Sequence, residues 1–395
     1  MAGTVRGDAD EVRLFTAQFV MLGLADLAYF TAVGVAIHTL PLYVTGPIDS
    51  DKAGAGLAFG AFGVTALICR PFAGRLSDTL GRRPLLIFGA LLAALGMVLL
   101  PHVDSLTLVV AIRLLQGVAE AAFFVAGFAL LADLAPPSRM GEALSYNSLG
   151  LYLGIAFGPP LAELLIENFD YTAAWYGATA LSVAAAVMVL TIAEPERDHS
   201  EAGHGKLIHR PGIPISLGFF ASLAAVSGFL AFASLHSAEI GLSNTSVALF
   251  TYGVVVVLCR IVFARVPDRL PSLPLAAASL AVIGCGLSVI ALWQQPVGLM
   301  AGVVIMAVGV SFSTPAFFSA IFATAKPSER GAAAGTASAF IDLGLGFGPI
   351  LLGLVADAQG IPSALGMGAA VAFAGAVWTS SLTRATASGS PPRSA

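Results

Sequence analysis

Charged residues are scarce in this sequence. Only 11% of its 395 residues are Asp, Glu, Lys or Arg, whereas 57% are hydrophobic and the mean hydropathy is +0.89. About a quarter of the residues of soluble globular domains are charged, so this composition excludes a water-soluble chain and indicates a protein solvated mainly by lipid. No basic tract accompanies the formal net charge of −4, which argues against a nucleic-acid partner.

Residue types that build catalytic and metal sites are also few. The three cysteines fall in apolar stretches without the spacing of a disulfide scaffold or a thiolate metal site, and we interpret them as packing residues. Three histidines recur every five residues, which could suggest a metal, but they lack helical spacing and a cysteine partner. With no G-x-x-x-x-G-K-S/T phosphate loop and no catalytic triad, we expect no ATP-driven pump, enzyme activity, cofactor or metal. The residues considered are Cys69, Cys259, Cys285, His199, His204 and His209.

Twelve long apolar stretches fill most of the chain. An α-helix needs about 20 such residues to cross a ~30 Å hydrocarbon core. The first stretch is too long for the apolar region of a cleavable signal peptide and is followed by eleven more, so we interpret it as the first span. We therefore expect an all-α polytopic membrane protein with helices at 14–44, 54–72, 84–101, 106–132, 142–166, 172–192, 213–236, 245–266, 273–293, 297–322, 331–356 and 362–383.

Positive charges gather in alternate connections between these stretches. Lys52 alone lies in an opposite-side connection, and Arg113 lies inside a helix. Under the positive-inside rule, this distribution predicts a multi-pass protein of the inner membrane with both termini in the cytoplasm. The cytoplasmic cations are Arg6, Arg13, Arg70, Arg75, Arg82, Arg83, Arg139, Arg197, Lys206, Arg210, Arg260, Arg265, Arg269, Lys326, Arg330, Arg384 and Arg393.

An internal repeat relates the two halves of the chain. Two segments match when the sequence is shifted by 190 positions. The repeat predicts six-helix bundles at 1–192 and 213–395, joined by a cytoplasmic linker at 193–212 and related by an axis along the membrane normal. Transporters built in this way bind substrate near the midplane, between halves that rock around it. The matches include Cys69, Arg70, Arg75, Asp78, Leu80 and Pro84 with Cys259, Arg260, Arg265, Asp268, Leu270 and Pro274, and Phe157-Gly158-Pro159 with Phe347-Gly348-Pro349.

A charged segment from Gly74 to Pro84 connects the second and third stretches, and we interpret it as a tight turn. Gly74 would permit close helix approach and Gly81 a backbone with positive φ. The segment resembles the major facilitator superfamily signature G-x-L-x-D-x-x-G-R-R/K, at the same place in the topology. The resemblance implies twelve helices in two pseudo-symmetric six-helix bundles, and is strongest to the drug or metabolite:proton antiporter group.

The resemblance also implies a conformational latch. In the family the signature Asp meets the start of the eleventh helix, and the following Arg pairs with an acid at the end of the fourth. The alternative is that the arginines only fix the topology. The corresponding residues are Gly74, Asp78, Gly81, Arg82, Arg83 and Asp133.

Polar residues interrupt the first and fourth helices. Arg113, Gln116 and Glu120 share one helix face and resemble the family motif R-x-x-Q-G, while Asp26 lies deep in the first helix. Buried charges of this kind normally face a partner or a water-filled cavity. We expect Asp26 and Glu120 to carry the transported proton, with Arg113 as modulator. One alternative is an Arg113–Glu120 ion pair within the helix that only neutralises its own two buried charges. The other is that Asp26 is hydrogen-bonded to the backbone.

Several residues are candidates for the substrate site. Asp342, near mid-membrane in the eleventh helix, could bind a cationic substrate or a second proton, or could face Arg260 or a backbone group. His38 is expected at the outer membrane interface. The remaining cavity candidates, whose aromatic members could equally be packing residues, are Gln116, Asn147, Tyr146, Tyr29 and Phe123.

Glycine and proline recur in the fifth and eleventh helices. They resemble the antiporter signature G-x8-G-x3-G-P-x2-G-G of exporting members, although in the fifth helix Ser145 replaces its first glycine and Ala162-Glu163 its terminal glycine pair. The alternative is generic close packing of small residues. The residues are Gly154, Gly158, Pro159, Gly344, Gly348 and Pro349.

These features predict a proton-coupled exporter of small apolar or cationic compounds. Three buried carboxylates are expected against one buried base, Arg113, which favours this function over uptake of a sugar or organic anion. The partners expected are a small-molecule substrate, protons and the lipid bilayer, and the protein is expected to be a monomer.

Overall fold

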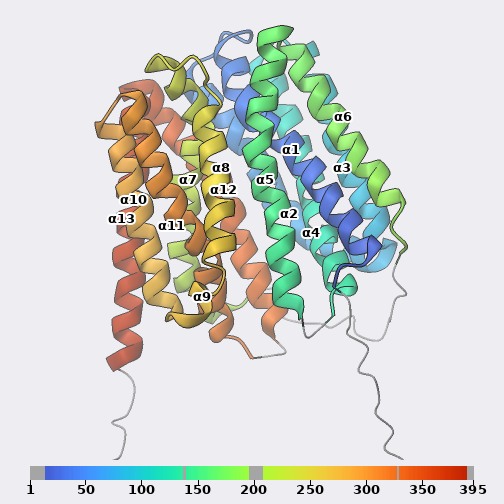
Figure 1. The fold of residues 1–395 in the computed structure, drawn as a ribbon, viewed down its shortest axis with the longest axis vertical. Helices are drawn as coiled ribbons and strands as arrows, with labels where there is room; N and C mark the ends of the chain where they lie inside the picture. The colour runs from blue at the N-terminus through green and yellow to red at the C-terminus, as the bar shows by residue number, and fades with distance from the viewer. Residues whose placement is uncertain (1–13, 137–138, 195–207, 327–328, 389–395) are drawn as a thin grey trace, which may run out of the picture.

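The computed structural model describes residues 14–136, 139–194, 208–326 and 329–388. All its regular elements in these ranges are helices (Figure 1). The predicted linker at 193–212 lies mostly outside them, with His199 and His204. The elements are α1 (Ala17–Thr45), α2 (Lys52–Leu80), α3 (Arg82–Leu99), η1 (Leu100–His102), α4 (Leu106–Leu134), α5 (Met140–Asn168), α6 (Tyr171–Leu190), η4 (Arg210–Gly212), α7 (Ile213–Glu239), α8 (Val247–Val262), α9 (Val266–Arg269), α10 (Ser272–Leu292), α11 (Pro296–Ala323), α12 (Arg330–Gln359) and α13 (Ile361–Ser388).

Eleven of the described helices are long and apolar enough to cross a membrane. The exception is α8, whose 16 residues extend about 24 Å at 1.5 Å per residue. The prediction of one helix over 245–266 was therefore too long, because the chain leaves helical geometry after Val262 and resumes it in the four-residue α9. Pro267 explains the break, since a proline lacks the N–H that would continue the helix and restricts the residue before it.

The signature segment is mostly helical. α2 continues to Leu80, eight residues beyond the predicted end, and the chain reverses at Gly81 alone. Gly81 has φ 113°, which confirms the positive φ predicted there and explains why a glycine is required. The prediction of a tight turn over the whole segment from Gly74 to Pro84 was wrong, because no proline or other helix-breaking residue separates Gly74 from Gly81.

The helices form two bundles, α1–α6 and α7–α13, which stand side by side in Figure 1. Within each bundle the repeat is visible in the packing of glycines. An added Cβ at Gly158 of α5 would lie 2.6 Å from the Gly34 backbone of α1, and one at Gly348 of α12 would lie 2.7 Å from Ala224 of α7. The glycines of the antiporter-like pattern therefore let α5 and α12 approach α1 and α7 at backbone distance.

Two seams join the bundles, one between α2 and α12 and the other between α5 and α8. At the first seam an added Cβ on Gly63 would lie 2.7 Å from Gly346 Cα, and at the second one on Gly253 would lie 2.7 Å from Ala156 Cα. These pairs are related by the shift of 190 positions. Both seams are therefore closed at backbone distance at these positions.

The lower ends of the first seam are apart. An added Cβ at Gly74 of α2 or at Gly335 of α12 would meet no described atom within 4 Å. α1 begins and α13 ends on this lower side (Figure 1), which we call the terminal side. The close approach predicted at Gly74 is absent in this arrangement, because no described atom faces either glycine across this end of the seam.

Candidate functional site

An ion pair joins the two halves at the level where they begin to part. The Nε and Nη2 atoms of Arg70 in α2 donate to the two carboxylate oxygens of Asp342 in α12, with Nη2 2.8 Å from Oδ1. The Arg70 and Asp342 side chains are 12% and 2% exposed. A bidentate pair of this kind supplies both charge and orientation, so it fixes α2 against α12.

The sequence analysis did not predict the pairing of Arg70 with Asp342. Arg70 counts there as one of the cations that orient the chain, and Asp342 as an acid facing Arg260, a backbone group or a substrate. In the structure Arg70 lies ten residues before the end of α2, and its own partner is Asp342. The signal that could have revealed it is the match of Arg70 with Arg260 in the repeat, which sets Arg70 apart from the cations that only orient the chain.

A second polar group lies beside this pair. The Tyr29 hydroxyl of α1 donates to Glu120 Oε2 of α4 at 3.1 Å. One turn along α4, Phe124 lies under the Arg70 guanidinium, with 4.4 Å between Cζ and the ring centre. Glu120 is close enough to Arg70 and Asp342 to interact electrostatically with both. The carboxylate predicted to carry a proton therefore adjoins the contact between the halves.

Asp26 is a buried acid whose bonded partner carries no charge. It is 3% exposed on α1, and its carboxylate bonds to the side chain of Asn147 on α5. The hydrogen-bond partner of Asp26 is therefore a side chain, and not the backbone group that the alternative interpretation expected. Glu120 is near enough to interact electrostatically with Asp26. Among the described residues, Asp26 has no ion-pair partner.

Arg113 binds backbone oxygens and a neutral side chain. Its guanidinium donates to the carbonyls of Ala58 at 3.1 Å and Phe59 at 3.3 Å in α2, and to Gln116 Oε1 at 2.7 Å. The alternative of an ion pair with Glu120 is not found among the described residues, because seven residues of helix separate the two by about 10 Å of rise. Arg113 therefore ties α4 to α2 and reaches Glu120 only through space.

Other substrate candidates are placed differently from expectation. Gln116 is buried against Met97 of α3, with Nε2 3.3 Å from the sulfur, so it does not share a partner with Glu120. Phe123 is 1% exposed and stacks on Tyr29 with 3.8 Å between ring centres, which makes it a packing residue. Tyr146 is 43% exposed and packs edge-on against Phe15. Only Asn147 and Tyr29 contact the acids of the site.

The predicted latch residues meet on the terminal side. Arg82 pairs with Asp133 at the end of α4 at 3.1 Å and with Asp78 at 3.4 Å. Arg83 instead donates to the Leu190 carbonyl of α6. The Asp78 side chain is 69% exposed, and a contact with the start of α12 is not seen among the described residues. These ion pairs stay within the first bundle in this arrangement.

Polar contacts also close the side opposite the termini. The Ser234 hydroxyl of α7 shares a hydrogen bond of 2.9 Å with Nδ1 of His38, and Lys52 of α2 pairs with Glu239 of α7 at 2.6 Å. His38 is 1% exposed, so its expected place at the membrane interface was wrong. The α1–α7 contact covers it.

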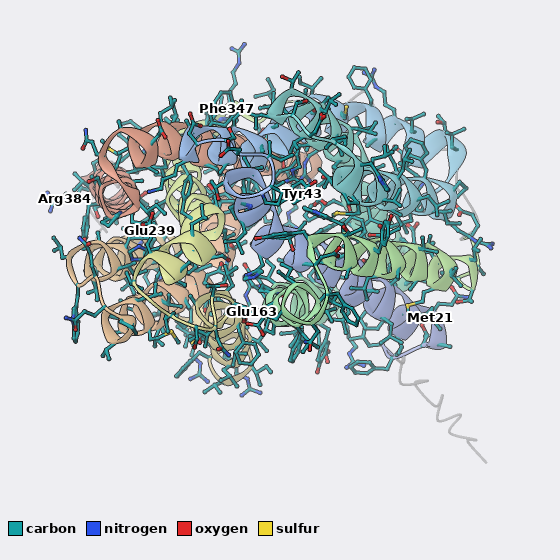
Figure 2. All side chains as sticks on the ribbon, turned by 90° about the horizontal axis from the view of Figure 1, so that it is seen from above. Met21, Tyr43, Glu163, Glu239, Phe347 and Arg384 are labelled. Atoms are coloured by element: carbon teal, nitrogen blue, oxygen red, sulfur yellow. The ribbon has the colours of Figure 1, made fainter. Side chains whose placement is uncertain are left out.

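Glu163 of α5 makes the most extensive of these contacts. It lies at the seam between the halves in the view from above (Figure 2). Its carboxylate accepts from the backbone N–H groups of Thr245 and Ser246 and from both of their hydroxyls, at 2.5–3.3 Å. These residues lead into α8, so the negative charge also meets the positive end of a helix.

We expect Glu163→Ala to open this side of the protein. Thr39 of α1 is fully buried and its hydroxyl has no partner among the described residues, so Thr39→Cys, in a variant with the three native cysteines replaced by alanine, reports opening without loss of a hydrogen bond. Loss of hydrogen bonds to a charged group is worth about 1.5–3 kcal/mol, which predicts labelling by a membrane-impermeant maleimide about 10-fold faster or more. Glu167→Ala, an exposed neighbour on α5, is the matched control. Equal rates in both variants would show that Glu163 does not hold this side closed.

The comparisons with known proteins agree with the fold. Two bundles of membrane-length helices with acids and arginines at their contact define a multi-pass membrane transporter. The chain belongs to the Major Facilitator Superfamily, whose family model matches residues 22–325 and 215–395. It is 29% identical over 369 residues to an uncharacterized MFS-type transporter of Salmonella typhimurium, covering 89% of this chain and 92% of that protein. An uncharacterized MFS-type transporter of Burkholderia pseudomallei is 27% identical over 375 residues, with 91% and 90% covered.

Solved structures share the fold. The nucleoside transporter NupG, as a D323A mutant, superposes with a TM-score of 0.78 at 14% identity, over 92% of this chain and 99% of that one. The human organic anion transporter MFSD10 gives a TM-score of 0.71 at 16% identity, over 92% and 98%. The predicted all-α major facilitator fold is confirmed.

Proposed function

We propose that this protein is a proton-coupled exporter of small molecules that works by alternating access. With both termini in the cytoplasm, as the positive charges of the sequence predict, the terminal side is the cytoplasmic side and the structure is inward-facing. Glu163, Lys52 and His38 then belong to an outer gate that is closed. The latch contact of Asp78 with α12 would form in the opposite, outward-facing state, which accounts for its exposure here.

Asp26 is the observation that best supports proton coupling. A carboxylate buried in an apolar setting disfavours its charged form unless a cation compensates it, and the described partner of Asp26 is the neutral Asn147. Asp26 can therefore take up and release a proton during transport. Glu120, which interacts with Asp26 and lies beside Arg70, would pass the effect of protonation to the contact between the halves.

The substrate class expected from the sequence loses its main support. In the sequence analysis the acids inside helices outnumbered the bases. In the structure the two numbers are equal, because the arginines inside helices are Arg70, Arg113 and Arg260 and the acids are Asp26, Glu120 and Asp342. The excess of negative charge that favoured a cationic substrate is therefore absent. Export is favoured over uptake only by the resemblance of the glycine and proline pattern of α5 and α12 to that of exporting members. The packing of these glycines against α1 and α7 is equally expected from generic close packing of small residues.

Reconstitution into vesicles with an internal pH dye tests this function. An outward substrate gradient should drive protons in the opposite direction, and a proton moving down 100 mV supplies about 2.3 kcal/mol for transport. The substrate panel contains neutral apolar compounds, lipophilic cations, a sugar and organic acids. Proton movement in the same direction as a sugar or organic acid would instead support uptake.

We expect cysteines at Gly74 and Gly335 to form a disulfide only when the cytoplasmic side closes. Both positions have open space around them here, and they continue the helix faces of α2 and α12 that touch at Gly63 and Gly346. In the variant without native cysteines, oxidation during turnover should cross-link the pair and stop transport, and a reductant should restore it. The single-cysteine variants are the controls. Absence of a cross-link under turnover conditions would contradict the proposed closure.

A further inference from the structure

Arg260 occupies in the second seam the place that Arg70 occupies in the first. The two arginines are 190 positions apart, and Arg260 reaches from α8 to α5 as Arg70 reaches from α2 to α12. Its Nη1 donates to the Ser148 hydroxyl at 3.0 Å and its Nη2 to the Tyr152 hydroxyl at 3.3 Å. The guanidinium carbon lies 4.5 Å from the centre of the Tyr152 ring. Each of these partners is neutral.

The carboxylate of the first seam has no counterpart in the second. The residue 190 positions before Asp342 is Tyr152. Arg70 holds Asp342 with the edge formed by Nε and Nη2. On Arg260 the same edge has a buried Nε without a partner among the described residues and a long Nη2 bond to Tyr152. One seam therefore contains a complete bidentate ion pair, and the other contains only its cationic half.

A cation without a counter-ion inside a helix of a membrane protein is costly, and such residues commonly mark a substrate or ion pathway. We infer that the Nε–Nη2 edge of Arg260 binds the carboxylate of the transported substrate, in the manner in which Arg70 binds Asp342. Bidentate recognition of carboxylates is the interaction for which the guanidinium geometry is best suited. Arg260 is half-buried two residues before the end of α8, so part of its side chain is accessible to a ligand.

The neighbours of Arg260 indicate the rest of the ligand. Tyr152 lies over the guanidinium, and Tyr252 of α8 interacts electrostatically with both groups. Tyr252 is 2% exposed and packs against Phe229 of α7, with 5.9 Å between ring centres, so it is a packing residue. The aromatic face of Tyr152 favours an apolar body, so the substrate class is a small organic acid with an aromatic or aliphatic body. The statement that the bound organic acid is the transported substrate rests on the proposed function. The anion site itself does not.

Equilibrium binding to the purified full-length protein in nanodiscs tests the site. The probes are benzoate, octanoate and the neutral isostere benzamide, and the readout is the concentration dependence of the thermal midpoint. We expect at least one of the two carboxylates to stabilise the wild type saturably and benzamide not to. Arg260→Gln should weaken carboxylate binding about 10-fold or more, because a charge-assisted bidentate contact is lost. Arg265→Gln removes an exposed arginine nearby and should leave binding unchanged.

A second variant keeps Arg260 and fills its free edge. Tyr152→Asp places a carboxylate where the repeat has Asp342, so it should abolish the response to the carboxylates while the folded protein is retained. Equal responses in Arg260→Gln and wild type, or no saturable response to either carboxylate, would overturn the inference. Because binding is measured without a proton gradient, Arg260-dependent binding in a protein that moves no protons would refute the proposed coupling and leave the anion site standing.

Discussion

Arg70→Gln and Asp342→Asn are each expected to destabilise the protein strongly. Each removes one member of an ion pair whose side chains are 12% and 2% exposed, and leaves the other charge buried without its partner. Breaking a buried pair in this way costs about 3–5 kcal/mol. The thermal midpoint and the yield of folded protein in detergent should fall in both single variants.

The double variant Arg70→Gln/Asp342→Asn should recover most of this loss. Its two neutral amides can hydrogen-bond to each other and leave no uncompensated charge. The matched control is Lys52→Gln, which breaks the other ion pair between the halves. Its side chains are 30% and 41% exposed, so its contribution is about 0–1 kcal/mol. A double variant as unstable as either single one would show that Arg70 and Asp342 do not stabilise the protein as a pair.

Asp26→Asn is expected to abolish proton movement and to preserve the fold. Asparagine has nearly the same shape and can still bond to Asn147, but it cannot release or accept a proton at neutral pH. Proton flux in the vesicle assay should fall to the level of protein-free vesicles. Exchange of labelled for unlabelled substrate at equal concentrations should continue, because no net proton transfer is required.

Asp170→Asn is the matched control for this variant. Asp170 is exposed at the start of α6, where its carboxylate accepts the N–H of Ala173 at 2.8 Å, and asparagine can replace it as a helix cap. Adding Glu120→Gln to Asp26→Asn should not restore proton movement. Proton-coupled transport that survives in this double variant would remove both acids from the coupling mechanism.

The first bundle shows where sequence reasoning succeeds. The R-x-x-Q-G motif correctly marks Arg113 and Gln116 as buried polar residues, and Asp26 is correctly placed deep in the first helix. Helical periodicity does not specify their partners. Gln116 contacts α3, Arg113 contacts α2, and Glu120 contacts α1, although the three were expected to share one face.

The seams between the halves show where sequence reasoning fails. Arg70 and Asp342 are 272 positions apart, so no local pattern connects them. In a soluble protein an apolar helix face would indicate which residues point inward, but here lipid and the protein interior are both apolar. The rotation of α2 and α12 about their axes, which decides that Arg70 meets Asp342, therefore leaves no hydrophobic pattern in either helix.

The sequence by itself determined the membrane environment, the class of fold, the repeat and the glycines that pack within each bundle. These depend on composition, length and small residues, which act locally along each helix. The tertiary structure alone decided that the halves are closed on one side and apart on the other, that Asp342 is neutralised by Arg70, and that Arg260 has no such acid. Those outcomes depend on how two bundles of uniformly apolar helices are turned and tilted toward each other, because the free energy of a buried charge is set by the partner that the packing brings to it.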